Sequence, residues 1–319
     1  QTNPATELYT CATDTCVGAW SIGQPATITG KRDMHQGGVG TQNSTALFSG
    51  YLHSPISAVT TATEEWNGSS WTSGGNVITG RYVGGNTGTQ NAALLIGGNV
   101  VSATLSNLTV EYDGSSWATG GNNPDGFDFL SAAGTQNAGI AFGGKTNPIA
   151  AARFCCNQHY DGTTWTAKNS LSFAKYSSGG VGTQNSTLAI SGWQGSAPYY
   201  QTSLSCVEEF DGTSWSTQTP VIYAAATGNA VGDSSAALAM GGYDYPSHRA
   251  YNQSWNGLGW SGESFMLGIS ARFAAGGSST DALTAKGDTN TCNMTQLWNS
   301  PQLGAGLQNW IGKVDFVTE

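Results

Sequence analysis

The sequence predicts an all-β fold, a β-propeller made of four-stranded antiparallel blades. Three observations predict this fold class. Glycine accounts for 45 of the 319 residues, which favours many turns between short strands. Two landmark motifs recur with a shared period of 45 to 50 residues, the range of propeller repeats. No segment has the apolar spacing of an amphipathic helix.

The first landmark is the sequence Gly-Thr-Gln-Asn, followed ten residues later by a second glycine. It begins at Gly40, Gly88, Gly134 and Gly182, with diverged copies at Gly232 and Gly277. Successive copies are 48, 46, 48, 50 and 45 residues apart. Between the two glycines lies a short apolar run, such as AALLI at 92–96, which is typical of a strand buried on both faces.

The second landmark is an aromatic residue followed by Asp-Gly or Asn-Gly and then by a tryptophan. The aromatic residues are Trp66, Tyr112, Tyr160, Phe210 and Trp255, with a weaker copy at Trp298. We expect a third strand that ends at the aromatic, a two-residue hairpin turn, and a fourth strand that begins near the tryptophan. A short glycine-rich first strand before each Gly-Thr-Gln-Asn completes four strands per unit. The repeated aromatic rings are then expected to pack between blades.

The number of blades depends on how the chain ends are used. Six full units run from about residue 28 to 303, within a single predicted domain over 1–319. Residues 5–23 resemble an extra pair of outer strands, with Trp20 in the place of Trp71, and residues 304–319 form a candidate closing segment. We therefore predict seven blades, the seventh built from both chain ends, with six blades as the alternative.

Composition excludes several classes of function. The formal charge is −9 and the 11 Lys and Arg residues form no run, so we expect no nucleic-acid partner. No apolar run approaches the roughly 18–20 residues of a membrane helix, so we expect no membrane insertion. Six cysteines allow fifteen pairings. Cys11 and Cys16 flank a short turn and are the candidate disulfide, while Cys156 and Cys206 occupy equivalent repeat positions that could also meet.

The chain lacks the usual signatures of catalysis. Its four histidines fall on different strands and loops of the predicted fold, and His159 is expected to be an exposed strand residue. The pairs Glu64-Glu65 and Glu208-Glu209 are adjacent on strands, so their side chains point to opposite faces. We expect them at solvated strand edges or in hydrogen bonds between blades. We predict no catalytic residue, no metal ion and no cofactor, and therefore a protein that is not an enzyme.

Binding function is predicted for the loops after the apolar strands, because these loops vary most between repeats and lie on one face of a propeller. Several carry aromatic rings suited to stacking on sugars or to the centre of a protein interface. The candidate ligand-binding residues are Tyr51, His53, Trp193, Tyr199, Tyr200, Tyr243, Tyr245 and His248. The alternative is that these rings pack on one another and only stiffen the loops.

The repeat resembles the kelch-like family, in which a strand ending in Gly-Gly precedes a tyrosine, a turn and a tryptophan. Ile96–Gly98 with Tyr112 and Trp117 has that order. The phrasing G-T-Q-N-x-A-L-x-x-G-G is similar to repeat arrays in virion and tail proteins of marine and cyanobacterial phages. That resemblance implies a non-enzymatic structural or adhesion protein, located in the virion, that docks to other virion proteins or contacts a host-surface glycan or protein receptor. It is also compatible with a homo-oligomer. The alternative is a secreted, extracellular kelch-like carbohydrate-active enzyme or lectin.

Overall fold

The structure is a computed structural model of the whole chain. It describes residues 18–27, 32–34, 38–53, 56–100, 104–145, 155–194, 202–226, 228–268, 271–287 and 294–300. All regular elements in these ranges are β-strands, which confirms the all-β prediction. The described part contains no helix long and apolar enough to cross a membrane.

Six antiparallel sheets of four strands each make up most of the described chain. We number them along the sequence and give the strands from the inside outward. Sheet 1 consists of β3 (Gly38–Thr41), β4 (Ser44–Phe48), β7 (Thr63–Trp66) and β8 (Trp71–Ser73). Sheet 2 consists of β9 (Gly85–Thr89), β10 (Ala92–Ile96), β11 (Thr109–Tyr112) and β12 (Trp117–Thr119). Sheet 3 consists of β13 (Ser131–Thr135), β14 (Ala138–Phe142), β15 (Asn157–Tyr160) and β16 (Trp165–Lys168).

The other three sheets repeat this plan. Sheet 4 consists of β17 (Gly179–Thr183), β18 (Ser186–Ile190), β21 (Val207–Phe210) and β22 (Trp215–Gln218). Sheet 5 consists of β23 (Asn229–Gly232), β24 (Ala237–Met240), β27 (Asn252–Trp255) and β28 (Trp260–Gly262). Sheet 6 consists of β29 (Ala274–Gly277), β30 (Asp281–Ala285), β31 (Thr295–Asn299) and β1 (Ala19–Gly23).

Short two-residue strands extend the loops of three sheets. They are β2 (Arg32–Asp33), β5 (Tyr51–Leu52) and β6 (Ala58–Val59) beside sheet 1, β19 (Trp193–Gln194) and β20 (Thr202–Ser203) beside sheet 4, and β25 (Tyr243–Asp244) and β26 (Ser247–His248) beside sheet 5.

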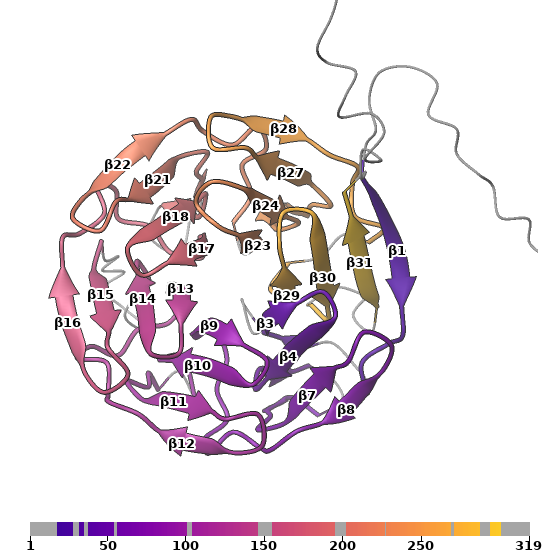
Figure 1. The fold of residues 1–319 in the computed structure, drawn as a ribbon, viewed down its shortest axis with the longest axis vertical. Helices are drawn as coiled ribbons and strands as arrows, with labels where there is room; N and C mark the ends of the chain where they lie inside the picture. Colours follow the sequence, from indigo (N-terminus) through magenta and orange to yellow (C-terminus); the bar gives the residue numbers. More distant parts are fainter. Residues whose placement is uncertain are drawn as a thin grey trace, which may run out of the picture.

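The sheets have a β-propeller-like arrangement around a central axis (Figure 1). The innermost strands pack side by side in the order β3, β9, β13, β17, β23 and β29, and β29 packs in turn against β3. Each sheet covers the apolar face of its neighbour, which is how a set of twisted sheets buries both faces of its second strands. Leu94 and Leu188, at the centres of β10 and β18, are fully buried as the apolar runs predict.

The sixth sheet combines the two ends of the described chain. Strand β1 pairs antiparallel with β31, with Trp20 opposite Trp298, so an N-terminal strand is the outermost strand of the last sheet. Strand β1 thus brings residues 19–23 of the predicted outer-strand segment 5–23 into the sheet of β29, β30 and β31, and the described residues form six four-stranded sheets. Residues 1–17, with Cys11 and Cys16, and the segment 304–319 lie outside the described residues.

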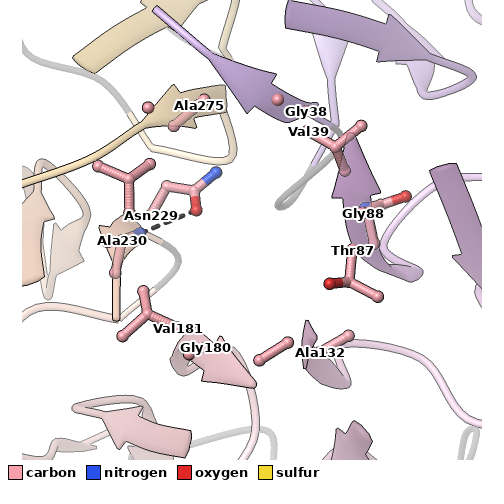
Figure 2. Close-up of a pocket in the computed structure, with 18 of the residues that line it drawn as sticks. Gly38, Val39, Thr87, Gly88, Ala132, Gly180, Val181, Asn229, Ala230 and Ala275 are labelled. Atoms are coloured by element: carbon pink, nitrogen blue, oxygen red, sulfur yellow. Dashed lines mark hydrogen bonds between the residues drawn. The ribbon is translucent and has the colours of Figure 1, made fainter. Parts of the chain in front are cut away.

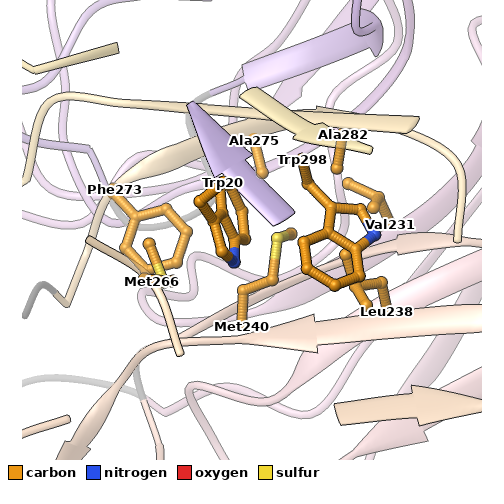
Figure 3. Close-up of a cluster of buried hydrophobic side chains, with 9 residues drawn as sticks. All are labelled: Trp20, Val231, Leu238, Met240, Met266, Phe273, Ala275, Ala282 and Trp298. Atoms are coloured by element: carbon orange, nitrogen blue, oxygen red, sulfur yellow. The ribbon is translucent and has the colours of Figure 1, made fainter. Parts of the chain in front are cut away.

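Packing between β1 and its neighbours holds this strand beside β31. The rings of Trp20 and Trp298 lie 5.5 Å apart and join a cluster with Met240, Met266 and Phe273 (Figure 3). This cluster holds side chains of both sheet 5 and sheet 6. The outer strand from the N-terminal side therefore fills the same role as the tryptophan-bearing outer strand of the other sheets.

The aromatic-turn-tryptophan phrase forms a staple between sheets. The carboxylate Oδ1 of Asp113 accepts hydrogen bonds from the backbone N–H groups of Ser115 (2.8 Å) and Ser116 (2.7 Å). Trp117 packs on Tyr112 at 4.9 Å, and its Nε1 donates to Thr63 Oγ1 of sheet 1 at 3.1 Å. The expected two-residue turn is wrong in one detail: four residues, 113–116, separate the strands because the aspartate side chain caps the backbone.

The Gly-Thr-Gln-Asn landmark is a second staple between sheets. The Gln90 amide Nε2 donates to the carbonyl oxygens of Thr45 (3.2 Å) and Trp66 (2.8 Å) in sheet 1. Gln42 makes the equivalent bonds to Ala282 and Trp298 of sheet 6. Each glutamine thus satisfies carbonyl groups of the preceding sheet, and the repeat of the motif is explained by structure rather than by ligand binding.

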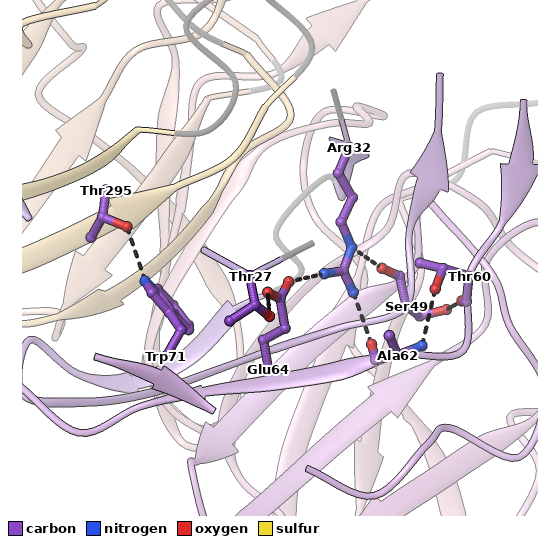
Figure 4. Close-up of polar contacts among 8 residues, drawn as sticks. All are labelled: Thr27, Arg32, Ser49, Thr60, Ala62, Glu64, Trp71 and Thr295. Atoms are coloured by element: carbon purple, nitrogen blue, oxygen red, sulfur yellow. Dashed lines mark hydrogen bonds and ion pairs between the residues drawn. The ribbon is translucent and has the colours of Figure 1, made fainter. Parts of the chain in front are cut away.

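The acidic pairs are also structural. Glu64 is buried and forms an ion pair with Arg32 (2.6 Å), whose Nε and Nη2 also donate to the carbonyls of Ser49 and Ala62 (Figure 4). Glu208 forms the equivalent buried pair with Lys175 at 3.0 Å. The expectation of solvated edges is therefore wrong for these two carboxylates, because each neutralises a cation in the connection that enters its own sheet.

Glu65, the neighbour of Glu64, does form a hydrogen bond between sheets, which was the other expectation for these acidic pairs. Glu65 Oε1 accepts a hydrogen bond of 2.5 Å from the Tyr112 hydroxyl of sheet 2. The prediction that Cys156 and Cys206 could meet is wrong, since both are free thiols.

Candidate binding site on the loop face

The two ends of the sheets differ in construction. One end carries the short turns of the two landmarks, and we call it the turn face. The other end carries the loops between second and third strands together with the connections between sheets, and we call it the loop face. Backbone bonds join neighbouring connections there: Phe129 N–H donates to Val83 O (2.7 Å), and Ser177 N–H donates to Phe129 O (2.9 Å). These bonds join the connections that enter sheets 2, 3 and 4.

A set of backbone-paired residues lies where each connection enters its sheet, and we call this set the collar. The first member of each pair comes from the connection, and the second directly follows the glycine that ends the apolar strand. The pairs are Asp33–Tyr51, Tyr82–Asn99, Asp128–Lys145, Tyr176–Trp193 and Ala226–Tyr243. The same backbone geometry therefore presents a different pair of side chains in each of sheets 1 to 5.

Side-chain contacts link these pairs into a continuous belt. The Tyr51 and Tyr82 rings lie 5.4 Å apart, and Asn99 Nδ2 donates to Asp128 Oδ2 at 2.7 Å. Lys145 Nζ then lies 5.4 Å from the ring of Tyr176 in the next pair. The belt is aromatic at one end and charged at the other, which suits a ligand with both apolar and polar surfaces.

The aromatic part of the belt spans sheets 4 and 5. Trp193 contacts Tyr176 at 5.8 Å and Tyr243 at 5.9 Å, and Tyr243 contacts His248 at 5.0 Å and Tyr245 at 6.4 Å. Trp193 is 5% exposed, whereas Tyr245 is 72% exposed. The buried indole thus supports rings that become more accessible toward the tip of the loop.

The charged part of the belt lies over sheets 1, 2 and 3. Arg272, from the connection into sheet 6, forms an ion pair with Asp33 at 2.8 Å. Burial raises the pKa of Asp128 to about 6, and the positive charge of Lys145 and the hydrogen bond from Asn99 oppose this shift. At neutral pH the ionised form of the Asp128 carboxyl is therefore favoured less strongly over the protonated form than in an ordinary aspartate.

Phe129 lies between these charges and covers the axis. Its ring is 4.5 Å from Lys145 Nζ and 5.9 Å from Arg272 Cζ. Phe129 enters sheet 3 and Arg272 enters sheet 6, which occupy opposite positions in the order of the inner strands. The contact between them therefore crosses the centre of the loop face. Both residues have φ values near +55°, 54° for Phe129 and 53° for Arg272, a left-handed conformation that non-glycine residues rarely adopt.

The inner strands line an open central cavity of about 130 Å³ (Figure 2). Glycine, alanine and valine provide most of its lining, and the polar side chains are those of Asn86, Thr87 and Asn229. Asn229 Oδ1 accepts a hydrogen bond from Ala230 N–H at 2.8 Å. Since no acid or base lines this cavity, the varied chemistry of the loop face lies in the collar above it.

A second aromatic group lies beside the belt on sheet 5. Tyr223 and Tyr251 are stacked at 4.5 Å with 17° between their planes, and Phe265 meets both rings edge-on. Arg249 lies 5.6 Å from the Tyr251 ring and pairs with Asp244 at 3.2 Å. This group extends the aromatic surface outward from Tyr243.

Of the predicted ligand-binding residues, Tyr51, Trp193 and Tyr243 are second members of collar pairs. His53, Tyr245 and His248 flank them, while Tyr199 and Tyr200 lie outside the described residues. Trp193 corrects the expectation of an exposed ring: it is buried, and here the alternative that loop aromatics pack on one another holds.

Sequence reasoning missed the residues that the connections contribute to the loop face. They are the collar members Tyr82, Asp128 and Tyr176 and the neighbouring residues Phe129 and Arg272. Each lies five or six residues before the glycine of a Gly-Thr-Gln-Asn landmark or its diverged copy, so alignment of the repeats on that glycine would have found them.

We also looked for metal ligands and for similarity to known proteins. Within the described ranges, no three His, Cys, Asp or Glu side chains come together as candidate metal ligands. No protein-family model matches the chain, and no curated protein matches it.

Proposed function

We propose that the chain is a six-bladed β-propeller, closed by β1, that acts without catalysis as a binding module of a phage particle. The loop face holds the ligand, and the turn face with its staples maintains the ring. The proposed location is the virion, and the proposed partners are a host-surface glycan or protein receptor and other virion proteins. The virion setting rests on the resemblance of the repeat phrasing to phage repeat arrays.

The observation that carries the binding role is the collar. Repeated backbone geometry there presents acids, an amide, a lysine and aromatic rings in different sheets, while the staples keep the same residue types from sheet to sheet. Loops on a rigid scaffold are the usual location of recognition. An exposed ring backed by packed aromatics, such as Tyr245 above Tyr243 and Trp193, binds sugars or apolar protein surface at little entropic cost.

The test is binding of the purified chain to a glycan array and to envelope fractions of candidate hosts. Tyr245→Ala removes an exposed ring from the loop face, and Leu258→Ala removes an 84% exposed side chain from the turn face as a matched control. We expect the first variant to lose at least tenfold in affinity and the second to bind as the parent does. Equal binding by both variants would exclude Tyr245, and the absence of binding to any glycan or fraction would refute the proposal.

One observation favours the alternative of a secreted carbohydrate-active enzyme. Asp128, with its pKa raised to about 6, has the property required of a general acid near neutral pH. Release of reducing sugar from a polysaccharide panel that is lost in Asp128→Asn would favour the enzyme, and binding without turnover would favour the binding module.

A further inference from the structure

Two seams between adjacent sheets are closed on the turn-face side by the same carboxylate–phenol pair. Tyr112 of sheet 2 donates to Glu65 of sheet 1 at 2.5 Å, and Tyr160 of sheet 3 donates to Glu111 of sheet 2 at 2.6 Å. A glycine is required beside each hydroxyl. A Cβ at Gly120 would lie 2.6 Å from the Tyr160 hydroxyl, and a Cβ at Gly74 would lie 2.6 Å from that of Tyr112.

The seam between sheets 3 and 4 departs from this arrangement at all three positions. His159 replaces the glutamate, Phe210 replaces the tyrosine, and Lys168 replaces the glycine. The substitutions are mutually consistent, because the Cβ of Lys168 would crowd a hydroxyl at position 210. The His159 and Phe210 rings meet edge-on at 5.3 Å. This seam therefore has a cation and an imidazole where the other two seams have a carboxylate.

A cavity of about 210 Å³ lies at this seam. Its lining includes His159, Lys168, Gln184, Asn185 and the backbone of Gly212. His159 is only 7% exposed, which corrects the expectation of an exposed strand residue, and its Nε2 has no hydrogen-bond partner. A buried imidazole nitrogen without a partner is unfavourable by about 1–3 kcal/mol, and a bound group would remove that penalty.

The cavity lining carries one cation, Lys168, and one acid, Asp161. Lys168 takes part in none of the ion pairs formed by the described residues. The one acid in the lining, Asp161, already accepts bonds from the N–H and hydroxyl groups of Thr163 and Thr164. Those bonds lower the pKa of Asp161, so it remains an anion with its acceptor sites engaged.

We propose that this cavity binds a small oxyanion, a carboxylate or phosphate group, beside the seam that lacks the carboxylate supplied by Glu65 and Glu111 in the other two. Lys168 supplies the charge, and His159 Nε2 and the Asn185 amide supply hydrogen-bond donors. Burial, with the charge of Lys168 acting in the same direction, lowers the pKa of His159 to about 4. The imidazole is then neutral at pH 7 and carries one N–H donor. The volume accommodates a monosaccharide-sized acid or several waters.

The test is isothermal titration of the full chain at pH 7 with sodium glucuronate, inorganic phosphate and glucose. Saturable binding of glucuronate or phosphate at one site, with no binding of glucose, supports the proposal, and the preferred anion identifies the carboxylate or phosphate class. Glucose binding as well as glucuronate, or no binding of either anion, overturns it.

Variants assign any binding to this seam. Lys168→Gln should weaken binding of the anion at least tenfold. His159→Glu should abolish binding because the new glutamate supplies the missing carboxylate from the chain itself. Gln218→Ala changes the equivalent position of the next sheet and should leave the dissociation constant unchanged. Unaltered binding in Lys168→Gln overturns the assignment. The site is independent of the loop-face function, so Tyr245→Ala should not affect it.

Discussion

The buried pair of Glu64 and Arg32 allows a stability prediction with a control inside the same chain. Glu64→Ala removes the carboxylate that accepts bonds of 2.6 Å from both Arg32 and Thr27. The guanidinium would remain fully buried with only the carbonyls of Ser49 and Ala62 as acceptors. Removal of one partner of a buried pair destabilises proteins by about 3–5 kcal/mol.

The position in sheet 2 that is equivalent to Glu64 indicates that the destabilisation lies at the lower end of this range. There Val110 stands in the place of Glu64, and Arg81 is buried without a carboxylate. Arg81 Nη1 bonds instead to the Leu108 carbonyl (2.8 Å) and to Ser106 Oγ (3.3 Å), while its Nε and Nη2 have no partner among the described residues. Burial lowers the pKa of Arg81 to about 10. The fold therefore tolerates an unpaired buried guanidinium when backbone carbonyls surround it, and we expect a loss of about 3 kcal/mol for Glu64→Ala.

The assay is urea unfolding followed by tryptophan fluorescence, with the midpoint compared at an unchanged slope. Val110→Glu tests the reasoning in the opposite direction, because the new carboxylate would meet Arg81. Val77→Glu, in the same apolar cluster, is its control. We expect Val110→Glu to be at least 2 kcal/mol less destabilising than Val77→Glu, since the new ion pair offsets part of the burial penalty. A loss below about 1 kcal/mol for Glu64→Ala, or equal losses for the two valine variants, would refute the argument.

Three further predictions concern the chain ends and the seams. Trp20→Ala should destabilise the protein by about 3–5 kcal/mol, measured by urea unfolding, because it opens the cluster that joins β1 to sheets 5 and 6. Burial and the glutamate partners raise the pKa values of Tyr112 and Tyr160 to about 12. The neutral phenols then stabilise the fold below pH 10, and this stability is lost as the pH rises from 10 to 12. Absorbance at 295 nm should show two late-titrating tyrosines, and titration of all tyrosines near pH 10 in the folded protein would contradict this. The pKa of His159 is lowered to about 4, so its contribution is complete above pH 6.5 and is lost as the pH falls toward 4. Thermal unfolding should show that His159→Gln reduces this acid sensitivity, and an unchanged pH profile would contradict the burial of the imidazole.

Much of the fold could be predicted because the sequence pattern behind each local interaction recurs several times along the chain. The apolar strands, the aspartate turns and the packing of Trp117 follow from short-range patterns that recur at a fixed period. The place of β1 could not be predicted with the same certainty. Strand β1 pairs with β31 because β31 has no other outer neighbour. The sequences of β1 and β31 alone do not show which distant strand lacks such a neighbour.

The candidate site was predicted in part for a related reason. Tyr51 and Tyr243 were found because they follow a landmark glycine, whereas Phe129 and Arg272 come from connections that no motif marks. The burial of Trp193 was missed because exposure depends on neighbours from another segment, here Tyr176 and Tyr243. Aromatic composition alone does not distinguish a ring that contacts a ligand from a ring that supports one.

The internal repeat provides a physical standard for each position, and departures from it indicate where function lies. At a seam, Glu65 with Tyr112 and Glu111 with Tyr160 make the same charge-assisted bond, worth about 1.5–3 kcal/mol each. The other four seams have Phe210, Trp255, Trp298 or Trp66 in place of the tyrosine and cannot make that bond, and the seam of His159 also leaves a buried imidazole nitrogen without a partner. A loss of this size is substantial against the total stability of about 5–15 kcal/mol for a domain. The same argument applies to the collar, where the backbone is repeated and the side chains are not. In both places the chain forgoes an interaction that it makes elsewhere, and a ligand that supplies the missing interaction is the simplest physical reason for it to do so.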